Sequence, residues 1–211
     1  WTCSSACSWP MWVVKLGGSL AESDRLPRWL RALAGRSDLV LVPGGGPFAD
    51  QVRAAQARWE FDDSSAHHMA LLAMEQFGRM LCALQAGLVP AASPRPIQYL
   101  IRKGETPVWM PTQMVLADPL IAHSWDLTSD SLAAWLCGRL NAGGLLLVKS
   151  ASLAGVPLDP AHLSDRGIVD RAFPAYAQTL RVPIRLLSDD DLDRLDATLS
   201  AGPPGAGGFS T

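Results

Sequence analysis

Residues 12–20 read WVVKLGGSL and place a lysine and two glycines at the end of a short apolar run that is typical of a strand. Lys15 would be a poor core residue there, but it is well suited to binding an anion. Gly17 and Gly18 leave backbone N–H groups accessible to a bound anion, while the ammonium group supplies positive charge. We therefore predict an anion-binding turn at this point, to which the rest of the chain contributes further groups.

The composition excludes several classes of protein. The chain has 211 residues, of which 48% are hydrophobic and 18% charged, with a net charge of -2 and a mean hydropathy of +0.13. This length suits one α/β domain or two small lobes. The nearly balanced charge argues against a nucleic-acid partner, and no run of about 18 apolar residues indicates a membrane span.

The four cysteines, Cys3, Cys7, Cys82 and Cys137, match neither a zinc-binding spacing nor a disulfide scaffold. A reducing, cytoplasmic setting is therefore expected. We also expect residues 1–10 to be a non-native or disordered extension before a natural start at Met11, and the glycine- and proline-rich residues 202–211 to form a flexible tail.

Strand-like and helix-like stretches alternate along the chain. Apolar runs typical of buried strands cover residues 13–16, 38–43, 145–148 and 184–187. Stretches with helical spacing of apolar residues cover 24–33, 48–58, 62–87, 131–140, 173–180 and 190–199. Residues 97–101 and 108–110 flank a turn at Lys103–Glu105 and predict a β-hairpin. The alternation predicts a three-layer α/β/α sandwich with a mostly parallel central sheet.

Several groups suited to phosphate chemistry follow the predicted strands. Lys15 and Lys149 each end a strand, residues 44–46 form a triple-glycine turn, and Asp130 opens a helix. Ligands of open α/β sheets bind at the carboxyl ends of the strands, so these groups are expected to converge. Two lysines could neutralise the charge of a transferring phosphoryl group, while an ionised Asp130 between them holds them in place.

Common alternatives lack their motifs. The sequence contains no G-x-x-x-x-G-K-[ST] phosphate loop and no G-x-G-x-x-G dinucleotide fingerprint after either glycine turn. The G-x-S-x-G elbow of hydrolases and the H-E-x-x-H zinc motif are also absent from the sequence.

Four motifs occur in an order that resembles the amino acid kinase superfamily, which includes aspartokinase, N-acetylglutamate kinase and UMP kinase. The motifs are VKLGGS at residues 14–19, VPGGG at 42–46, LTSDSLAA at 127–134 and LVK at 147–149. Within this group, residues 66–74 and 123–130 are similar to the kinases of methanofuran biosynthesis that act on 5-(aminomethyl)furan-3-ylmethyl phosphate. The resemblance covers roughly residues 11–160.

The resemblance implies the amino acid kinase fold and an ATP-dependent kinase that phosphorylates a small phosphorylated acceptor, giving a diphosphate, with Mg²⁺ bridging the donor phosphates and no protein side chains as metal ligands. It implies that Lys15 and Lys149 contact the transferred phosphoryl group while Asp130 orients them. The residues implied to bind ATP phosphates are Gly17, Gly18, Ser19, Gly44, Gly45 and Gly155. The residues implied to bind the acceptor are Gly46, Asp50, His67, Thr128 and Ser129, with Asp50, Asp62 or Asp63 receiving the ammonium group of an aminomethylfuran.

The resemblance also implies one domain over residues 11–201, with an acceptor half at about 11–145 and a shortened nucleotide half at about 146–201. Relatives commonly form dimers or larger homo-oligomers, so the same is expected here. The chain departs from the group at Ala154, where an acidic residue usually precedes the Gly-Val pair.

Other interpretations of the same residues remain open. The acceptor could be UMP or that of another family kinase, and the chain could be a non-catalytic nucleotide-binding or storage subunit. Asp130 could act only on the helix dipole and Ser129 only as a helix N-cap. His67 could serve packing, and for His68 a surface or packing role is favoured.

Overall fold

The computed structural model describes residues 11–151, 153 and 156–200. The expectations for residues 1–10 and 202–211, and for Cys3, Cys7, Ala154 and Gly155, therefore lie outside the described residues. Within the described residues, no helix is both long and apolar enough to cross a membrane.

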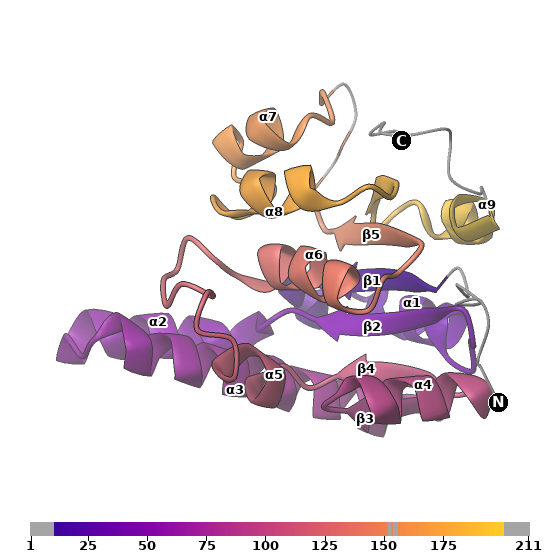
Figure 1. Ribbon diagram of the computed structural model, residues 1–211, viewed down its shortest axis with the longest axis horizontal. Helices are drawn as coiled ribbons and strands as arrows, with labels where there is room; N and C mark the ends of the chain where they lie inside the picture. Colours follow the sequence, from indigo (N-terminus) through magenta and orange to yellow (C-terminus); the bar gives the residue numbers. More distant parts are fainter. Residues whose placement is uncertain (1–10, 152, 154–155, 201–211) are drawn as a thin grey trace, which may run out of the picture.

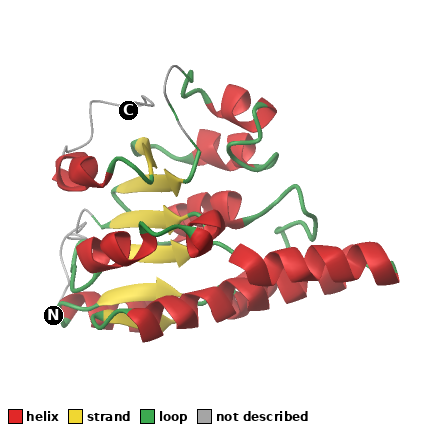
Figure 2. Ribbon diagram, turned by 180° about the vertical axis from the view of Figure 1, so that it is seen from behind, coloured by secondary structure: helices red, strands yellow, loops and turns green. Residues whose placement is uncertain are grey.

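In the described part of the chain, six parallel strands form the central sheet, in the order β3-β4-β2-β1-β5-β6. The strands are β1 (Trp12–Leu16), β2 (Leu39–Pro43), β3 (Leu88–Ala91), β4 (Thr106–Trp109), β5 (Gly144–Lys149) and β6 (Ile184–Ser188). Figure 2 shows their carboxyl ends at one edge of the sheet. The central strands are apolar on both faces, as expected of strands that are covered on both sides.

Helices connect the strands and cover both faces. The helices are α1 (Leu26–Leu33), α2 (Gly46–Trp59), α3 (Asp63–Leu84), α4 (Pro94–Arg102), α5 (Thr112–Leu116), α6 (Ser129–Arg139), α7 (Pro160–Asp165), α8 (Phe173–Thr179) and α9 (Leu195–Ser200), with short 3₁₀ turns η1 (Gly18–Glu22) and η2 (Leu192–Arg194). Figure 1 shows α4, α5 and α6 in front of the sheet and α1 behind it.

Alternating side chains of β1 separate two hydrophobic cores. Val13 packs in the core that contains the inward residues of α6 and α8, whereas Val14 and Leu16 pack in the core that contains those of α1 and α9. This two-residue period is the ordinary geometry of a strand covered on both faces. The predicted three-layer α/β/α sandwich is confirmed, with a sheet in which every described pairing is parallel.

The predicted β-hairpin is wrong. Residues 97–101 lie in α4, and β3 pairs with β4 in parallel, so α4 is a crossover helix between them. Ile97 and Ile101 are buried one helical turn apart, and a proline in the first turn suits a helix start. A short apolar run of this kind fits either a strand or one face of a helix.

The sequence analysis also missed three short elements, β3, α5 and α7. β3 contains Pro90, which disfavours a central strand, but β3 lies at the edge of the sheet, where a missing N–H donor is tolerated. The helix expected at 190–199 is divided into η2 and α9.

Candidate active site

Two lysines project from neighbouring strands onto the same face of the sheet. Lys15 of β1 is aligned with Leu147 of β5, and Lys149 lies two residues further along β5. Since side chains alternate along a strand, positions 15, 147 and 149 share one face. Leu147 packs in the core that also contains the inward residues of α6, so both lysines face that helix.

Asp130, in the first turn of α6, lies between these lysines. One carboxylate oxygen is 2.9 Å from Lys15 Nζ, and the other accepts a hydrogen bond of 2.6 Å from Lys149 Nζ. The Asp130 side chain is 6% exposed, and those of Lys15 and Lys149 are 5% and 11% exposed. Three charges are therefore buried together, and their sum is one positive charge.

Burial and mutual charge set the protonation of this cluster. Burial raises the pKa of Asp130, but the adjacent Lys15 and Lys149 outweigh it and hold the pKa at about 2. Burial, with repulsion by Lys15, lowers the pKa of Lys149 to about 8, against the opposing effect of Asp130. At neutral pH the carboxylate is ionised and Lys149 is largely protonated.

The two glycine turns pack backbone against backbone beside the lysines. A Cβ atom on Gly18 would lie 2.4 Å from the Gly46 nitrogen, and one on Gly44 would lie 2.5 Å from the Gly18 nitrogen. Gly46 also has a left-handed φ of 53°, which favours glycine. Side chains are therefore excluded from this contact for steric reasons alone.

The N–H groups of these turns divide into two sets. Gly17 donates to Val148 O and Gly44 donates to Leu16 O, each at 3.0 Å, so these two groups extend the strand ladder. Gly18 begins η1 and Gly46 begins α2, and the first N–H groups of a helix have no acceptor within it. The N–H groups that can still bind phosphate are thus those that follow each strand by two or more residues.

A cavity of about 330 Å³ opens next to the glycine turns. Its buried floor includes His67, Leu71, Met74, Leu127, Ser129 and Leu132. Its exposed rim includes Ser19, Glu22, Pro47, Asp50, Arg53 and Asp63. Gly18, Gly45, Gly46 and Thr128 also line it. The residues expected to bind the acceptor, Gly46, Asp50, His67, Thr128 and Ser129, therefore lie around one cavity.

His67, which lines this cavity, has a buried polar atom. Its side chain stacks on His123 with ring centroids 4.7 Å apart, and its Nε2 has no hydrogen-bond partner among the described residues. Burial, with the charges of His123 and His68, lowers the pKa of His67 to about 4. His67 is therefore neutral at physiological pH, and His68 is exposed.

A chain of polar contacts forms the rim. Arg53 pairs with Asp50 at 2.9 Å, and its guanidinium lies 4.4 Å from the ring centroid of Trp125. Trp125 Nε1 donates to Gln56 Oε1 at 2.6 Å, and Gln56 Nε2 donates to Asp63 at 2.9 Å. The sequence analysis missed Arg53, although its position three residues after Asp50 places both on one face of α2.

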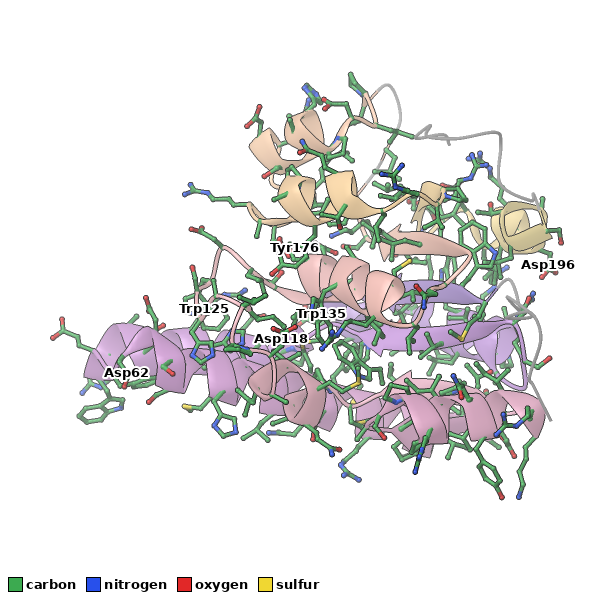
Figure 3. The ribbon with its side chains drawn as sticks, in the orientation of Figure 1. Asp62, Asp118, Trp125, Trp135, Tyr176 and Asp196 are labelled. Atoms are coloured by element: carbon green, nitrogen blue, oxygen red, sulfur yellow. The ribbon has the colours of Figure 1, made fainter. Side chains whose placement is uncertain are left out.

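Asp62 has a different role from Asp50 and Asp63. Its carboxylate caps α3 by accepting from Ser65 N and Ser65 Oγ, each at 2.8 Å, and the first of these bonds is the main cause that lowers its pKa. Asp62 is not among the residues that line the cavity. Figure 3 shows Asp62 near the end of the α2–α3 pair that lies away from the sheet, and Trp125 closer to α6.

The start of α6 is bound by Asp170, a residue that the sequence analysis missed. Thr128 is the N-cap and Ser129 is the first helical residue, so Ser129 is not the cap. The Thr128 hydroxyl and N–H both donate to Asp170, at 2.8 and 3.0 Å. Asp170 lies between α7 and α8. It belongs to no sequence motif, and a lone aspartate shortly before a helix suggests only a local cap of that helix.

Comparisons with known proteins identify the family and the fold. The model of the amino acid kinase family matches residues 10–153. The 5-(aminomethyl)furan-3-ylmethyl phosphate kinase of Methanocaldococcus jannaschii is 30% identical over 134 residues, which are 62% of this chain and 61% of that relative. The chain therefore matches less than two thirds of the length of that relative.

Three solved kinase structures share the fold. The uridylate kinase of Archaeoglobus fulgidus has a TM-score of 0.64 at 12% identity, covering 92% of this chain and 98% of that one. The UMP kinase of Bacillus anthracis has a TM-score of 0.65 at 16% identity, covering 90% and 93%. The UMP kinase of Ureaplasma parvum has a TM-score of 0.64 at 14% identity, covering 93% and 97%. At these identities the likeness concerns the fold.

Proposed function

Because the chain belongs to the amino acid kinase family, whose model matches residues 10–153, we propose that it is an ATP-dependent kinase of a small phosphorylated acceptor. The acceptor is 5-(aminomethyl)furan-3-ylmethyl phosphate, and the product is its diphosphate. This choice of acceptor is supported by the name of the Methanocaldococcus relative and by the charge distribution of the cavity.

The observation that carries the proposal is the buried Lys15–Asp130–Lys149 cluster at the carboxyl ends of β1 and β5. In phosphoryl transfer, negative charge spreads over the oxygens of the moving group, and catalysis is mostly positioning and charge stabilisation. Lys15 and Lys149 contact that group from two strands. Asp130 keeps the two ammonium groups close together, which their mutual repulsion would otherwise oppose.

The chemistry requires no strong base. An oxygen of the acceptor phosphate bonds to the γ-phosphorus of ATP, the bond from that phosphorus to the bridging oxygen breaks, and ADP leaves. A phosphate monoester has a second pKa of about 6, so at neutral pH the attacking oxygen already lacks a proton. The protein's task is to bring two anionic groups together in line.

The residues near the lysines hold the phosphates. Gly18, Ser19 and Gly45 bind those of ATP, while Gly46 and the Ser129 hydroxyl bind that of the acceptor. The absence of side chains at Gly18 and Gly44 lets the two glycine turns pack backbone against backbone, which brings the phosphate-binding N–H groups of both turns close together. A bound Mg²⁺ would neutralise part of the charge of the donor phosphates, and we assign it no side-chain ligand in this chain.

The cavity suits an acceptor that is anionic at one end and cationic at the other. Its inner end adjoins the glycine turns and Ser129, and the rim carries the carboxylates of Glu22, Asp50 and Asp63. Among the described residues that line the cavity, Arg53 is the one cation. Arg53 is already paired with Asp50, so the rim has net negative charge. An aminomethyl group would be attracted there, whereas the phosphate would be drawn toward the lysines. The apolar floor suits a small flat ring.

A coupled assay of ADP release tests the proposal. The acceptors to compare are 5-(aminomethyl)furan-3-ylmethyl phosphate, its hydroxymethyl analogue without the amine, UMP, aspartate and N-acetylglutamate. We expect the highest kcat/KM with the aminomethyl compound and a diphosphate product by mass spectrometry. Preference for UMP contradicts the acceptor assignment, and ATP binding without acceptor-dependent ADP release favours a storage subunit. Light scattering of the same protein tests the expected homo-oligomer.

A further inference from the structure

The carboxylate of Asp170 is the meeting point of five donors from two helices. One oxygen accepts from Thr128 N at 3.0 Å, Thr128 Oγ1 at 2.8 Å and Ser131 N at 3.0 Å. The other accepts from Ser131 Oγ and from Phe173 N, the latter at 3.0 Å. Asp170 thereby joins the start of α6 to the start of α8.

This arrangement replaces the usual local cap of a helix. Thr128 is the N-cap residue of α6, yet its hydroxyl makes no cap bond to that helix. Instead, Asp170 accepts the Ser131 N–H from 39 residues away in the sequence. A carboxylate at a helix N-terminus is favourable both for the free N–H groups and for the helix dipole.

The two residues anchored by Asp170 lie on either side of the two site residues in the first turn of α6. Thr128 and Ser131 flank Ser129, which lines the cavity, and Asp130, which contacts both lysines at 2.9 and 2.6 Å. A shift or rotation of this turn would lengthen at least one of those two contacts. It would also move the Ser129 hydroxyl relative to the glycine turns.

We propose that Asp170 is a positioning residue: by anchoring Thr128 and Ser131, its carboxylate keeps Asp130 between the two lysines and Ser129 at the cavity. The inference deepens the proposed kinase function and rests on it. Asp170 touches neither the acceptor nor the transferred group. Besides anchoring the α6 turn, it acts by its charge on Lys149 and raises the pKa of that ammonium group, against the lowering by burial. A misplacement of about 1 Å in such a site can cost about 10²-fold in rate.

Asp118 provides a matched control, because it tethers the other half of the same helix. Its carboxylate accepts from Trp135 Nε1 at 3.1 Å and pairs with Arg139 at 3.7 Å. Figure 3 shows Asp118 and Trp135 together, over α5 and α6. Asp118→Ala therefore removes a side-chain anchor of α6 far from its first turn, which reveals the effect of a loosened helix alone.

The kinetic test compares Asp170→Ala, Asp170→Asn and Asp118→Ala with the unsubstituted chain. We expect Asp170→Ala to lower kcat by about 10- to 10²-fold with a KM for ATP within about threefold, and Asp118→Ala to leave both nearly unchanged. Asp170→Asn keeps the shape of the side chain but places an amide donor against other donors. Its kcat should therefore lie between those of Asp170→Ala and Asp118→Ala. This second variant keeps the test valid where the alanine variant fails to fold. Equal kinetics in the Asp170 and Asp118 variants would overturn the inference.

A double-mutant cycle with Ser129→Ala separates positioning from general loss of stability. If Asp170 holds Ser129 in position, Ser129→Ala should lower kcat/KM for the acceptor in the otherwise unsubstituted chain but should have almost no further effect in the Asp170→Ala variant. If the double variant instead shows the product of the two single losses in kcat/KM, the positioning role is contradicted.

A substrate-free measurement distinguishes failure of this inference from failure of the proposed function. Carbon-13 labelling of the lysine side chains gives NMR signals for Lys15 and Lys149, assigned with Lys15→Arg and Lys149→Arg. In Asp170→Asn the Lys149 signal should shift in any case, because the charge of Asp170 acts on it directly, so the Lys15 signal carries the test. The Lys15 signal should shift in Asp170→Asn and stay in place in Asp118→Ala. Absence of turnover in the unsubstituted chain would refute the kinase assignment alone, whereas an unchanged Lys15 signal in Asp170→Asn would refute the positioning role.

Discussion

The ammonium groups of Lys15 and Lys149 lie 2.9 and 2.6 Å from the two oxygens of one buried carboxylate. The strands that carry them are adjacent, but the lysines are far apart in sequence, so the sheet register sets their spacing. Buried like charges repel strongly at such distances, and the shared carboxylate makes the arrangement stable. Each prediction below follows from this cluster or from the cavity beside it.

Lys15→Ala should lower kcat by at least about 10²-fold while the protein stays folded, because the transferred group loses one of its two cations. The measurement is coupled ADP release, with thermal unfolding recorded in parallel. Lys103→Ala is the matched control, since Lys103 is exposed and is not one of the two lysines that contact Asp130. Near-normal turnover of Lys15→Ala would reject the assignment of this residue.

Activity should fall on the alkaline side as Lys149 loses its proton. Burial, with the charge of Lys15, lowers the pKa of Lys149 to about 8, so the ammonium form is present below that pH and is lost above it. We expect kcat/KM for ATP to decline above about pH 8, since this parameter reports the free enzyme. Lys149→Arg should lower the rate and remove this decline; a decline that persists in the arginine variant would assign it to another group.

Gly18→Ala should destabilise the protein by about 1–3 kcal/mol, because the added Cβ would lie 2.4 Å from the Gly46 nitrogen and separate the two glycine turns. Gly138→Ala in α6 is the contrasting control. Its Cβ would meet Leu180 at an ordinary 3.7 Å, and alanine should stabilise the helix by about 0.5–1 kcal/mol. Urea unfolding of both variants measures this; similar values for the two would contradict the steric argument.

His67→Phe should raise the acceptor KM by about three- to tenfold with a smaller change in kcat, which corresponds to one lost neutral hydrogen bond. The phenyl ring can retain the stacking on His123 but lacks the unpaired Nε2. His68→Phe changes the exposed neighbour and should leave KM unaltered. An unchanged KM in His67→Phe would indicate that this histidine serves packing.

Combined Asp50→Asn and Asp63→Asn should raise KM by about fivefold or more for the aminomethyl acceptor and leave KM unchanged for its hydroxymethyl analogue. Exposed charge pairs are worth up to about 1 kcal/mol each, which sets this modest scale. Asp62→Asn, at a residue that caps α3, is the control. Equal changes in KM for both acceptors would show that the rim carboxylates do not bind the amine.

Much of this architecture could be predicted because its signals are local. Apolar runs next to Lys15 and Lys149 predicted β1 and β5, and the glycines at 44–46 predicted the turn after β2. The family prediction is confirmed by the match over residues 10–153, since motifs in a fixed order identify a fold better than any one of them.

Two errors show where local signals end. Residues 97–101 (IQYLI) contain two β-branched isoleucines and enough apolar side chains to suggest a strand. The parallel pairing of β3 with β4 requires a crossover between them, and α4 supplies it. Asp170 was missed because its partners Thr128 and Ser131 lie 42 and 39 residues away. Long-range capping of this kind leaves no periodic or spacing signature.

The pairing of β1 with β2 on one side and β5 on the other has a consequence for biosynthesis. A nascent polypeptide that has emerged only as far as α6 has an open hydrogen-bonding edge along β1, a strand that is buried over its whole length in the folded protein, and its Asp130 faces a single cation. Exposed edges of this kind promote aggregation. Translational pausing just before residues 144–149 leave the ribosome is therefore expected to demand chaperone protection.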